Sequence, residues 1–199
     1  KGCKKRTSEC CGNLQNDCKD KKIRIKRSGE CHLSELSAGV FVKLGLVDVV
    51  DKKDKVLKTI DRGDTLHSDI LRVVGVFILN EKNEIMLQLR SPKSYRYPLY
   101  WDCSAGGHVD TGEEYITSAY RELYEEVGIK TPLVFLGKHY IELDDGRKHF
   151  IAFFKGMYNG KIKIDLHEVS KVSFFSIKEI KKMIDARKKI HPECLFALK

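Results

Sequence analysis

The chain has 199 residues and a net charge of +9, with 42% hydrophobic and 33% charged residues. This length fits one domain of ordinary size with a good core, and leaves room for an appendage. No stretch approaches the roughly 18 apolar residues of a membrane span. Residues 7–22 are too polar for a targeting segment, so we expect no membrane association and a reducing cytoplasmic location. The absence of Met at position 1 indicates a fragment or a processed product.

The first 31 residues hold most of the charge and most of the cysteines. Ten Lys or Arg stand there against four acidic residues, together with five of the seven cysteines. The gaps between these cysteines do not match the close pairs of a zinc site, and the odd total argues against a complete disulfide framework. No aromatic residue in this segment could stack on a nucleic-acid base, so nucleic-acid binding is disfavoured. We predict a basic, mostly solvated extension over residues 1–39, with its flexibility left open, and a catalytic domain over residues 40–199.

Strand patterns follow. The apolar runs 46–50 and 56–60 flank a polar turn and predict a hairpin. A continuous apolar run, 72–79, and an alternating run, 84–90, predict paired strands of a central sheet with a turn at 80–83. The loop 91–102 is aromatic and includes Trp101. Such a loop either stacks on a substrate or belongs to the core.

The segment Gly107–Ile129 contains the signals of one helix. Thr111 and Glu114 have the spacing of a capping box, which predicts a start near Gly112, and Gly128 predicts the end. Apolar residues recur between them at three- and four-residue steps and predict one buried face: Ile116, Ala119, Tyr120, Leu123 and Val127.

Three acidic residues of this helix, Glu122, Glu125 and Glu126, stand at i, i+3 and i+4. Like charges at this spacing cost about 0.2–0.5 kcal/mol per pair, so the arrangement is poor for stability alone. A hard cation such as magnesium or manganese, which prefers oxygen ligands, would reverse the effect. The alternative is a solvated acidic face with no ion.

Nine positions of the segment fit the Nudix box: Gly107, Glu113, Arg121, Glu122, Leu123, Glu125, Glu126, Gly128 and Ile129. The chain therefore resembles the Nudix hydrolase family. The resemblance implies an α/β fold, an α/β/α sandwich around a mixed sheet, and hydrolysis of a nucleoside diphosphate linked to another moiety.

The same resemblance implies roles for single residues. Magnesium, or manganese, would be held by Glu122, Glu125, Glu126 and the Gly107 carbonyl, with Glu125 and Glu126 also counted as catalytic. Arg121 would pair with Glu113 and orient its carboxylate. Glu168 would act as an additional ligand or base.

After the box, runs 133–142 and 149–155 predict two strands joined at 144–146, followed by short strands at 162–164 and 172–175. Ser176 and Glu179 form a second capping box that opens a helix with Ile177, Ile180 and Ile184 facing inward. His191 and Pro192 are expected to end this helix. Residues 194–196 would then pack back as an apolar patch.

A second resemblance is to isopentenyl-diphosphate isomerases, which share the Nudix fold. It is carried by residues 90–91 and 101–108, and it adds Arg90, Trp101 and His108 as candidates for substrate binding. These isomerases need a catalytic cysteine directly before the box glycine, where this chain has Gly106. Of their metal-binding histidines, His108 matches one and His67 is a candidate for another.

Three hypotheses result. The first is a metal-dependent hydrolase of a small-molecule diphosphate, the second an isopentenyl-diphosphate isomerase, and the third a Nudix module that binds without catalysis. A homodimer is left open. The residues do not name the substrate.

Overall fold

The computed structural model describes residues 45–199, so the extension predicted over residues 1–39 lies outside the described residues. From residue 45 onward the elements are β1 (Leu46–Val50), β2 (Val56–Asp61), the 3-10 helix η1 (Arg62–Asp64), β3 (Ile70–Leu79), β4 (Ile85–Arg90), β5 (Trp101–Asp102), β6 (Ala105–His108), α1 (Tyr115–Val127), β7 (Val134–Glu142), β8 (Lys148–Met157), β9 (Val169–Phe175), α2 (Ile177–Asp185) and α3 (Pro192–Leu198). None of these helices is both long and apolar enough to cross a membrane.

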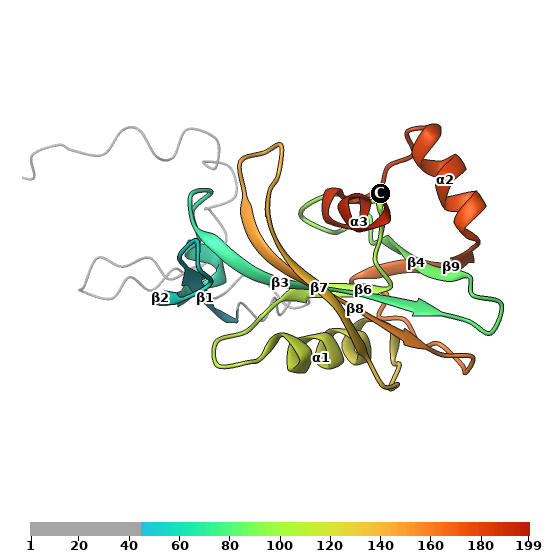
Figure 1. Ribbon diagram of the computed structural model, residues 1–199, viewed down its shortest axis with the longest axis horizontal. Helices are drawn as coiled ribbons and strands as arrows, with labels where there is room; N and C mark the ends of the chain where they lie inside the picture. The colour runs from blue at the N-terminus through green and yellow to red at the C-terminus, as the bar shows by residue number, and fades with distance from the viewer. Residues whose placement is uncertain (1–44) are drawn as a thin grey trace, which may run out of the picture. The chain divides into compact units, whose positions relative to one another are not determined.

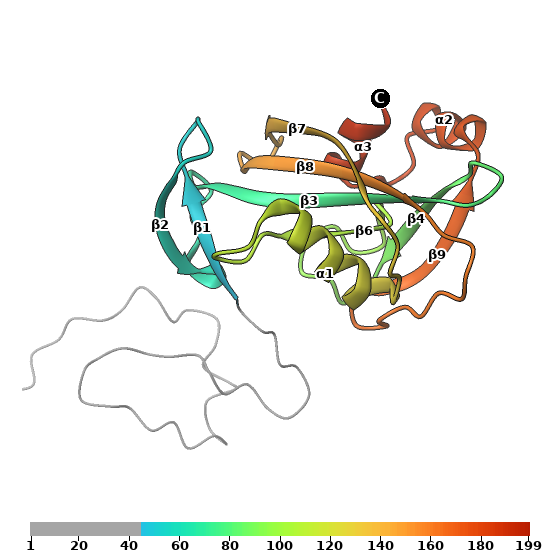
Figure 2. The ribbon, with the colours of Figure 1, turned by 60° about the horizontal axis from the view of Figure 1, so that its bottom comes forward.

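Strand β3 is the centre of the sheet. It pairs in parallel with β8 along its whole length, and antiparallel with β6 from Val73 to Val76. The antiparallel partners β1 and β4 meet only the two ends of β3, and Figure 2 shows β3 passing between these neighbours. A strand covered on both faces reads as a continuous apolar run, as β3 does.

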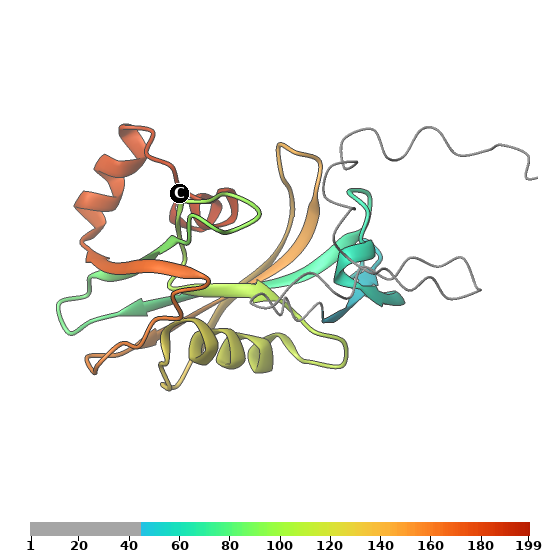
Figure 3. The same cartoon turned by 180° about the vertical axis from the view of Figure 1, so that it is seen from behind.

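The helices lie on opposite faces of this mixed sheet. Figure 1 shows α1 on one face and α2 with α3 on the other, and Figure 3 shows the same layers from behind. The side chains of β3 alternate between the two faces, so Val74 packs with Leu123 of α1, whereas Val73 belongs to the cluster that contains Ile180 of α2. The predicted α/β/α sandwich is therefore confirmed.

Most elements with local signals form as predicted, although Ile177 of α2, which was expected to face inward, is 71% exposed. β1 and β2 make the expected hairpin, and β7 pairs antiparallel with β8. The second capping box is present in full, because Ser176 Oγ accepts from Glu179 N and Glu179 accepts from Ser176 N. The predicted pairing of β3 with β4 is limited to Ile78 and Leu79, because β6 pairs with the preceding residues of β3, from Val73 to Val76.

The predicted start of α1 is wrong. Thr111 does not cap the helix; its hydroxyl donates to Asp48 Oδ1 at 3.1 Å, and α1 begins after Glu114 without a side-chain cap. The predicted apolar face is also rotated. Ile116 and Tyr120 are exposed, whereas Ser118, Glu122 and Glu126 are buried together with Ala119, Leu123 and Val127.

Two further expectations near the C-terminus are corrected. Residues 162–164 do not form a strand, because the backbone there bonds to the end of α1, with Lys163 N donating to Val127 O. His191 and Pro192 do not end a helix. They begin α3, since proline fits the first turn of a helix, where its missing N–H leaves no bond unmade.

Candidate active site

Glu126 is the most deeply buried carboxylate of the box, with a relative exposure of 3%. Its Oε2 accepts two hydrogen bonds of 3.0 Å, from the Gly106 N–H of β6 and from Nε2 of Gln88 on β4. Burial, and then the negative charges of Glu122 and Glu168, raise the pKa of Glu126 well above its ordinary value. The sheet therefore holds this carboxylate in one place and makes its negative charge costly.

Glu122 lies one turn earlier on α1 and faces Gly107. A Cβ on Gly107 would stand 2.2 Å from Glu122 Oε1, so only glycine leaves room for the carboxylate. Burial raises the pKa of Glu122 to about 7, against the lowering effect of Arg121, whose Nη1 donates to Oε1 at 2.8 Å. The neighbouring charges of Glu168 and Glu125 raise this pKa further.

Arg121 links the acidic residues to the loop before the helix. Its Nη2 donates to Glu113 Oε2 at 2.9 Å and to the His108 carbonyl at 3.0 Å. The hydrogen bond from Arg121, supported by one of 2.5 Å from the Ser118 hydroxyl, holds the pKa of Glu113 below its usual range. The contact expected between Arg121 and Glu113 is present, and it fixes both side chains.

The end of α1 is tied to the loop that carries Glu168. Gly128 adopts a φ of 68°, a conformation that favours glycine, and closes the helix. Asp165 N then donates to the Glu126 carbonyl at 2.8 Å, which anchors the loop before β9 beside the helix. Glu168 is exposed at the end of this loop, near enough for its charge to raise the pKa of both Glu122 and Glu126.

The three helix carboxylates do not point together. Glu125 is exposed and contacts Arg121 Nη1 at 3.3 Å, whereas Glu122 and Glu126 turn inward. Within residues 45–199, the set of three metal-capable side chains with ligand atoms closest together lies elsewhere, at Asp102, Cys103 and Cys194. The box nevertheless fits a hard cation, because it places repelling, buried carboxylate oxygens together, with that of Glu122 close against the backbone of Gly107.

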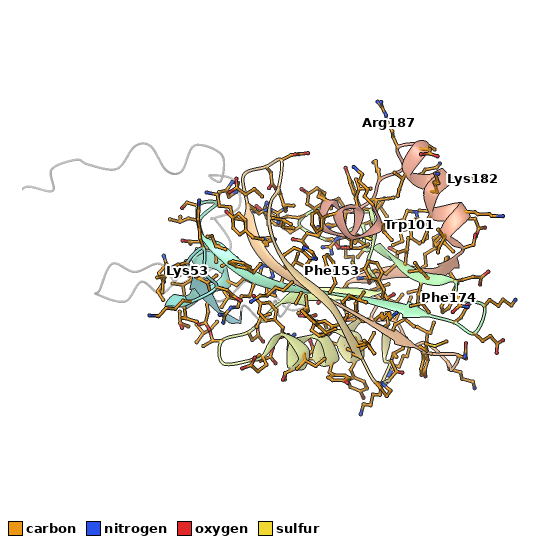
Figure 4. The ribbon with its side chains drawn as sticks, viewed as in Figure 1. Lys53, Trp101, Phe153, Phe174, Lys182 and Arg187 are labelled. Carbon is orange, nitrogen blue, oxygen red and sulfur yellow. The ribbon has the colours of Figure 1, made fainter. Side chains whose placement is uncertain are left out.

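The candidates for substrate binding are not gathered with these carboxylates. Arg90 Nη1 pairs with Asp102 at 3.2 Å, and Trp101, labelled in Figure 4, packs edge-to-face on Phe175 at 5.0 Å. The ring of His108 lies 6.1 Å from that of His149. Burial lowers the pKa of His108 to about 3, so its imidazole is neutral.

Sequence reasoning missed Gln88. It is 2% exposed, its Nε2 holds Glu126, and its Oε1 has no hydrogen-bond partner within residues 45–199. The available signal was a polar residue inside a buried strand, on the face opposite to Leu87 and Leu89, which faces α1. Asp110, whose Oδ2 lies 3.8 Å from Arg121 Nη2, was missed as well.

The mixed sheet lies between helices, and the buried carboxylates of α1 face the two glycines of β6. These features define an α/β/α enzyme with an acidic site. Residues 69–194 match the family model described as NUDIX domain. The chain belongs to the Nudix family and is an enzyme of the Nudix hydrolase type.

Individual proteins resemble the chain over most of this domain. An uncharacterized Nudix hydrolase of Pseudomonas aeruginosa, PA4841, is 29% identical over 130 residues, covering 65% of this chain and 77% of that protein. An isopentenyl-diphosphate Delta-isomerase of Pectobacterium atrosepticum is 29% identical over 139 residues, covering 67% and 78%.

Solved structures share the fold. The protein DR0079 of Deinococcus radiodurans has a TM-score of 0.68 at 21% identity, covering 77% of this chain and 96% of that one. A MutT protein of Methanosarcina mazei has a TM-score of 0.57 at 26% identity, covering 67% and 93%.

Proposed function

We propose that the enzyme hydrolyses the diphosphate linkage of a nucleoside diphosphate joined to another moiety, with magnesium or manganese as cofactor. The observation that carries this proposal is the buried pair Glu122 and Glu126, whose negative charges are costly where they stand. A divalent cation is the partner that makes both charges favourable, and a diphosphate is the substrate class that shares such a cation with protein carboxylates.

Glu122, Glu126, Glu125 and the Gly107 carbonyl would hold the cation. When bound, it supplies charge neutralisation for the diphosphate and a lowered pKa for water. The support from the described residues is unequal: Glu122 and Glu126 are buried and held in place, whereas Glu125 is exposed and must leave Arg121 to join them.

The remaining residues have positioning and proton-handling roles in this proposal. Gly106 N–H and Gln88 keep Glu126 Oε2 in place. Arg121, itself fixed by Glu113, holds Glu122 and limits its rotation. Glu168, exposed beside both carboxylates, is the side chain we assign as base, because solvent can reach it and carry the proton away.

The isomerase is the second candidate, favoured by the likeness to the Pectobacterium atrosepticum isomerase. The position of the isomerase cysteine is Gly106. Cys103 is 3% exposed and its sulfur faces Gly75, with 3.2 Å to the place of a Cβ there. A thiol packed against the centre of β3 has no open side for an alkene, so hydrolysis is the better supported reaction.

The test is turnover of a panel of substrates with magnesium and with manganese: nucleotide sugars, ADP-ribose, dinucleotides, nucleoside triphosphates and isopentenyl diphosphate. We expect a nucleoside monophosphate, or a second phosphorylated product, from at least one nucleotide substrate. An allylic product without phosphate release would overturn the proposal in favour of the isomerase. Absence of turnover, with ligand binding unchanged in Glu125→Gln, would support a binding module instead. A cytoplasmic location and a homodimer remain predictions.

A further inference from the structure

A second group of metal-capable side chains lies apart from the box carboxylates, between β5 and α3. Asp102, Cys103 and Cys194 each offer one ligand atom, and these atoms all lie within 4.8 Å of one another. Both cysteines are free and almost fully buried, at 3% and 0% exposure. Asp102 ends β5 and Cys194 lies on α3, so segments far apart in the sequence meet here.

His191 adds an unexplained nitrogen to this group. It is 7% exposed, and its Nδ1 has no hydrogen-bond partner in the part of the chain that the structure describes. The nearest carboxylate atoms are Asp102 Oδ1 at 3.8 Å and Glu193 Oε2 at 3.9 Å, and both are too far for a hydrogen bond even if Nδ1 carries a proton. A buried polar atom without a partner costs about 1–3 kcal/mol, so this nitrogen is available to bind a ligand.

The position of His191 is fixed by the backbone rather than by its ring. It precedes the first turn of α3, and its N–H donates to the Trp101 carbonyl at 2.7 Å. Cys194 follows three residues later in the first turn of the same helix. The start of α3 therefore supplies an imidazole and a thiol to the end of β5, which supplies a carboxylate and a second thiol.

We propose that Asp102, Cys103, His191 and Cys194 form a zinc site. Sulfur, nitrogen and carboxylate oxygen together are the donors that zinc accepts in tetrahedral sites, whereas magnesium and calcium avoid thiolates. Arg90, 3.2 Å from Asp102 Oδ2, completes the charge balance. Two thiolates, one carboxylate, one guanidinium and one divalent ion sum to zero, which lowers the cost of burying them.

The geometry requires only small movements. Zinc bond lengths of about 2.0–2.3 Å place tetrahedral ligand atoms roughly 3.3–3.8 Å apart. The separation of 3.8 Å between His191 Nδ1 and Asp102 Oδ1 is at this limit. The donor atoms of Asp102, Cys103 and Cys194, which lie within 4.8 Å of one another, must close by at most about an ångström. His191 stands just outside their set, so its ring must turn toward the two sulfurs.

A catalytic thiol is the competing reading of these cysteines. A hydrogen bond with Cys194, together with burial, raises the pKa of Cys103 well above its ordinary value, and burial raises that of Cys194. Reactive cysteines need the opposite shift and access to solvent. The raised pKa values therefore argue against a nucleophilic role for either thiol. An ion held at their position would tie α3 to β5 and to the segment leading into Gly106 and Gly107.

The experiment uses a reference protein, the full chain with its five N-terminal cysteines replaced by serine: Cys3, Cys10, Cys11, Cys18 and Cys31. Sulfur ligation then reports only on Cys103 and Cys194. Cobalt is titrated as a spectroscopic probe, and zinc is added to displace it. We expect one thiolate-ligated cobalt per chain, with a sulfur charge-transfer band and tetrahedral visible bands that zinc removes, whether or not further cobalt binds to the box carboxylates. Cobalt bound only to the box carboxylates gives no sulfur band, so this outcome is independent of the hydrolase proposal.

Variants then assign the ligands. Cys194→Ala should abolish the sulfur band or reduce it by half, and His191→Gln should weaken cobalt binding at least tenfold. His139→Gln, an exposed histidine outside this group, should leave both unchanged. Zinc should also raise the melting temperature of the reference protein. The proposal would be overturned by the absence of a sulfur band at saturating cobalt in the reference protein, a result that needs no substitution at the site. It would also be overturned if His191→Gln bound cobalt with unchanged affinity.

Discussion

Replacing Gly107 by alanine tests the claim that the position of Glu122 matters for activity. The added Cβ would stand 2.2 Å from Glu122 Oε1 and 2.5 Å from Cδ, whereas nonbonded atoms settle at about 3.5 Å. The clash is with the end of a side chain, so the carboxylate moves by about 1 Å rather than the backbone. Its hydrogen bond of 2.8 Å with Arg121 is then lost.

A misplacement of about 1 Å in an active site costs on the order of a hundredfold in rate, or about 2.7 kcal/mol of transition-state stabilisation. We therefore expect kcat/KM to fall about a hundredfold in Gly107→Ala, and manganese binding, followed by its effect on water relaxation, to weaken in parallel. The loss of global stability should be only about 1 kcal/mol, as for one hydrogen bond.

Two other glycines serve as controls. A Cβ on Gly106 would meet the Val74 carbonyl at 2.6 Å, a backbone atom that cannot turn away, so Gly106→Ala should lose stability first. A Cβ on Gly112 would meet no other atom, but φ there is 81°. Gly112→Ala should therefore introduce a small backbone strain and leave activity nearly unchanged. If Gly107→Ala kept its activity and manganese affinity within threefold, Glu122 would not be a metal ligand.

Three further predictions follow from single residues. Glu126→Gln should lower turnover at least a hundredfold, and a loss below tenfold in steady-state assays would show that another residue carries the metal. The raised pKa of Glu122, about 7 against 4.5, means that the folded state binds a proton more readily than the unfolded state. The metal-free protein should therefore lose up to roughly 3 kcal/mol of stability as the pH rises through this interval. Thermal unfolding with a chelator measures this loss. Magnesium should stabilise more at high pH, Glu122→Gln should flatten the pH dependence, and a stability that rises with pH would contradict the assignment. Ser176→Ala should cost about 1 kcal/mol in urea unfolding, with turnover unchanged, because it removes the cap of α2 far from the carboxylates; equal stability would show that the cap is replaced.

Local signals predicted the parts of this molecule whose partners are close in the chain. The two hairpins, the capping box of α2 and the end of α1 at Gly128 all depend on residues a few positions apart. Thr111 failed as a helix cap because Asp48, far away in the sequence, takes its hydroxyl. Likewise, residues 162–164 read as a strand, yet their backbone completes the end of α1.

The sequence by itself determined the family and the acidic helix, because the spacing of the box needs no knowledge of the neighbours. Only the tertiary structure decided which carboxylates are buried. Glu125 and Glu126 lie on either side of Glu122 around the helix axis, and the contact with β4 and β6 selects Glu126 and leaves Glu125 exposed. The same holds for Cys103 and Cys194, which meet only because α3 folds back on β5. Spacing along a helix is a property of the chain, whereas burial depends on which surface the helix packs against.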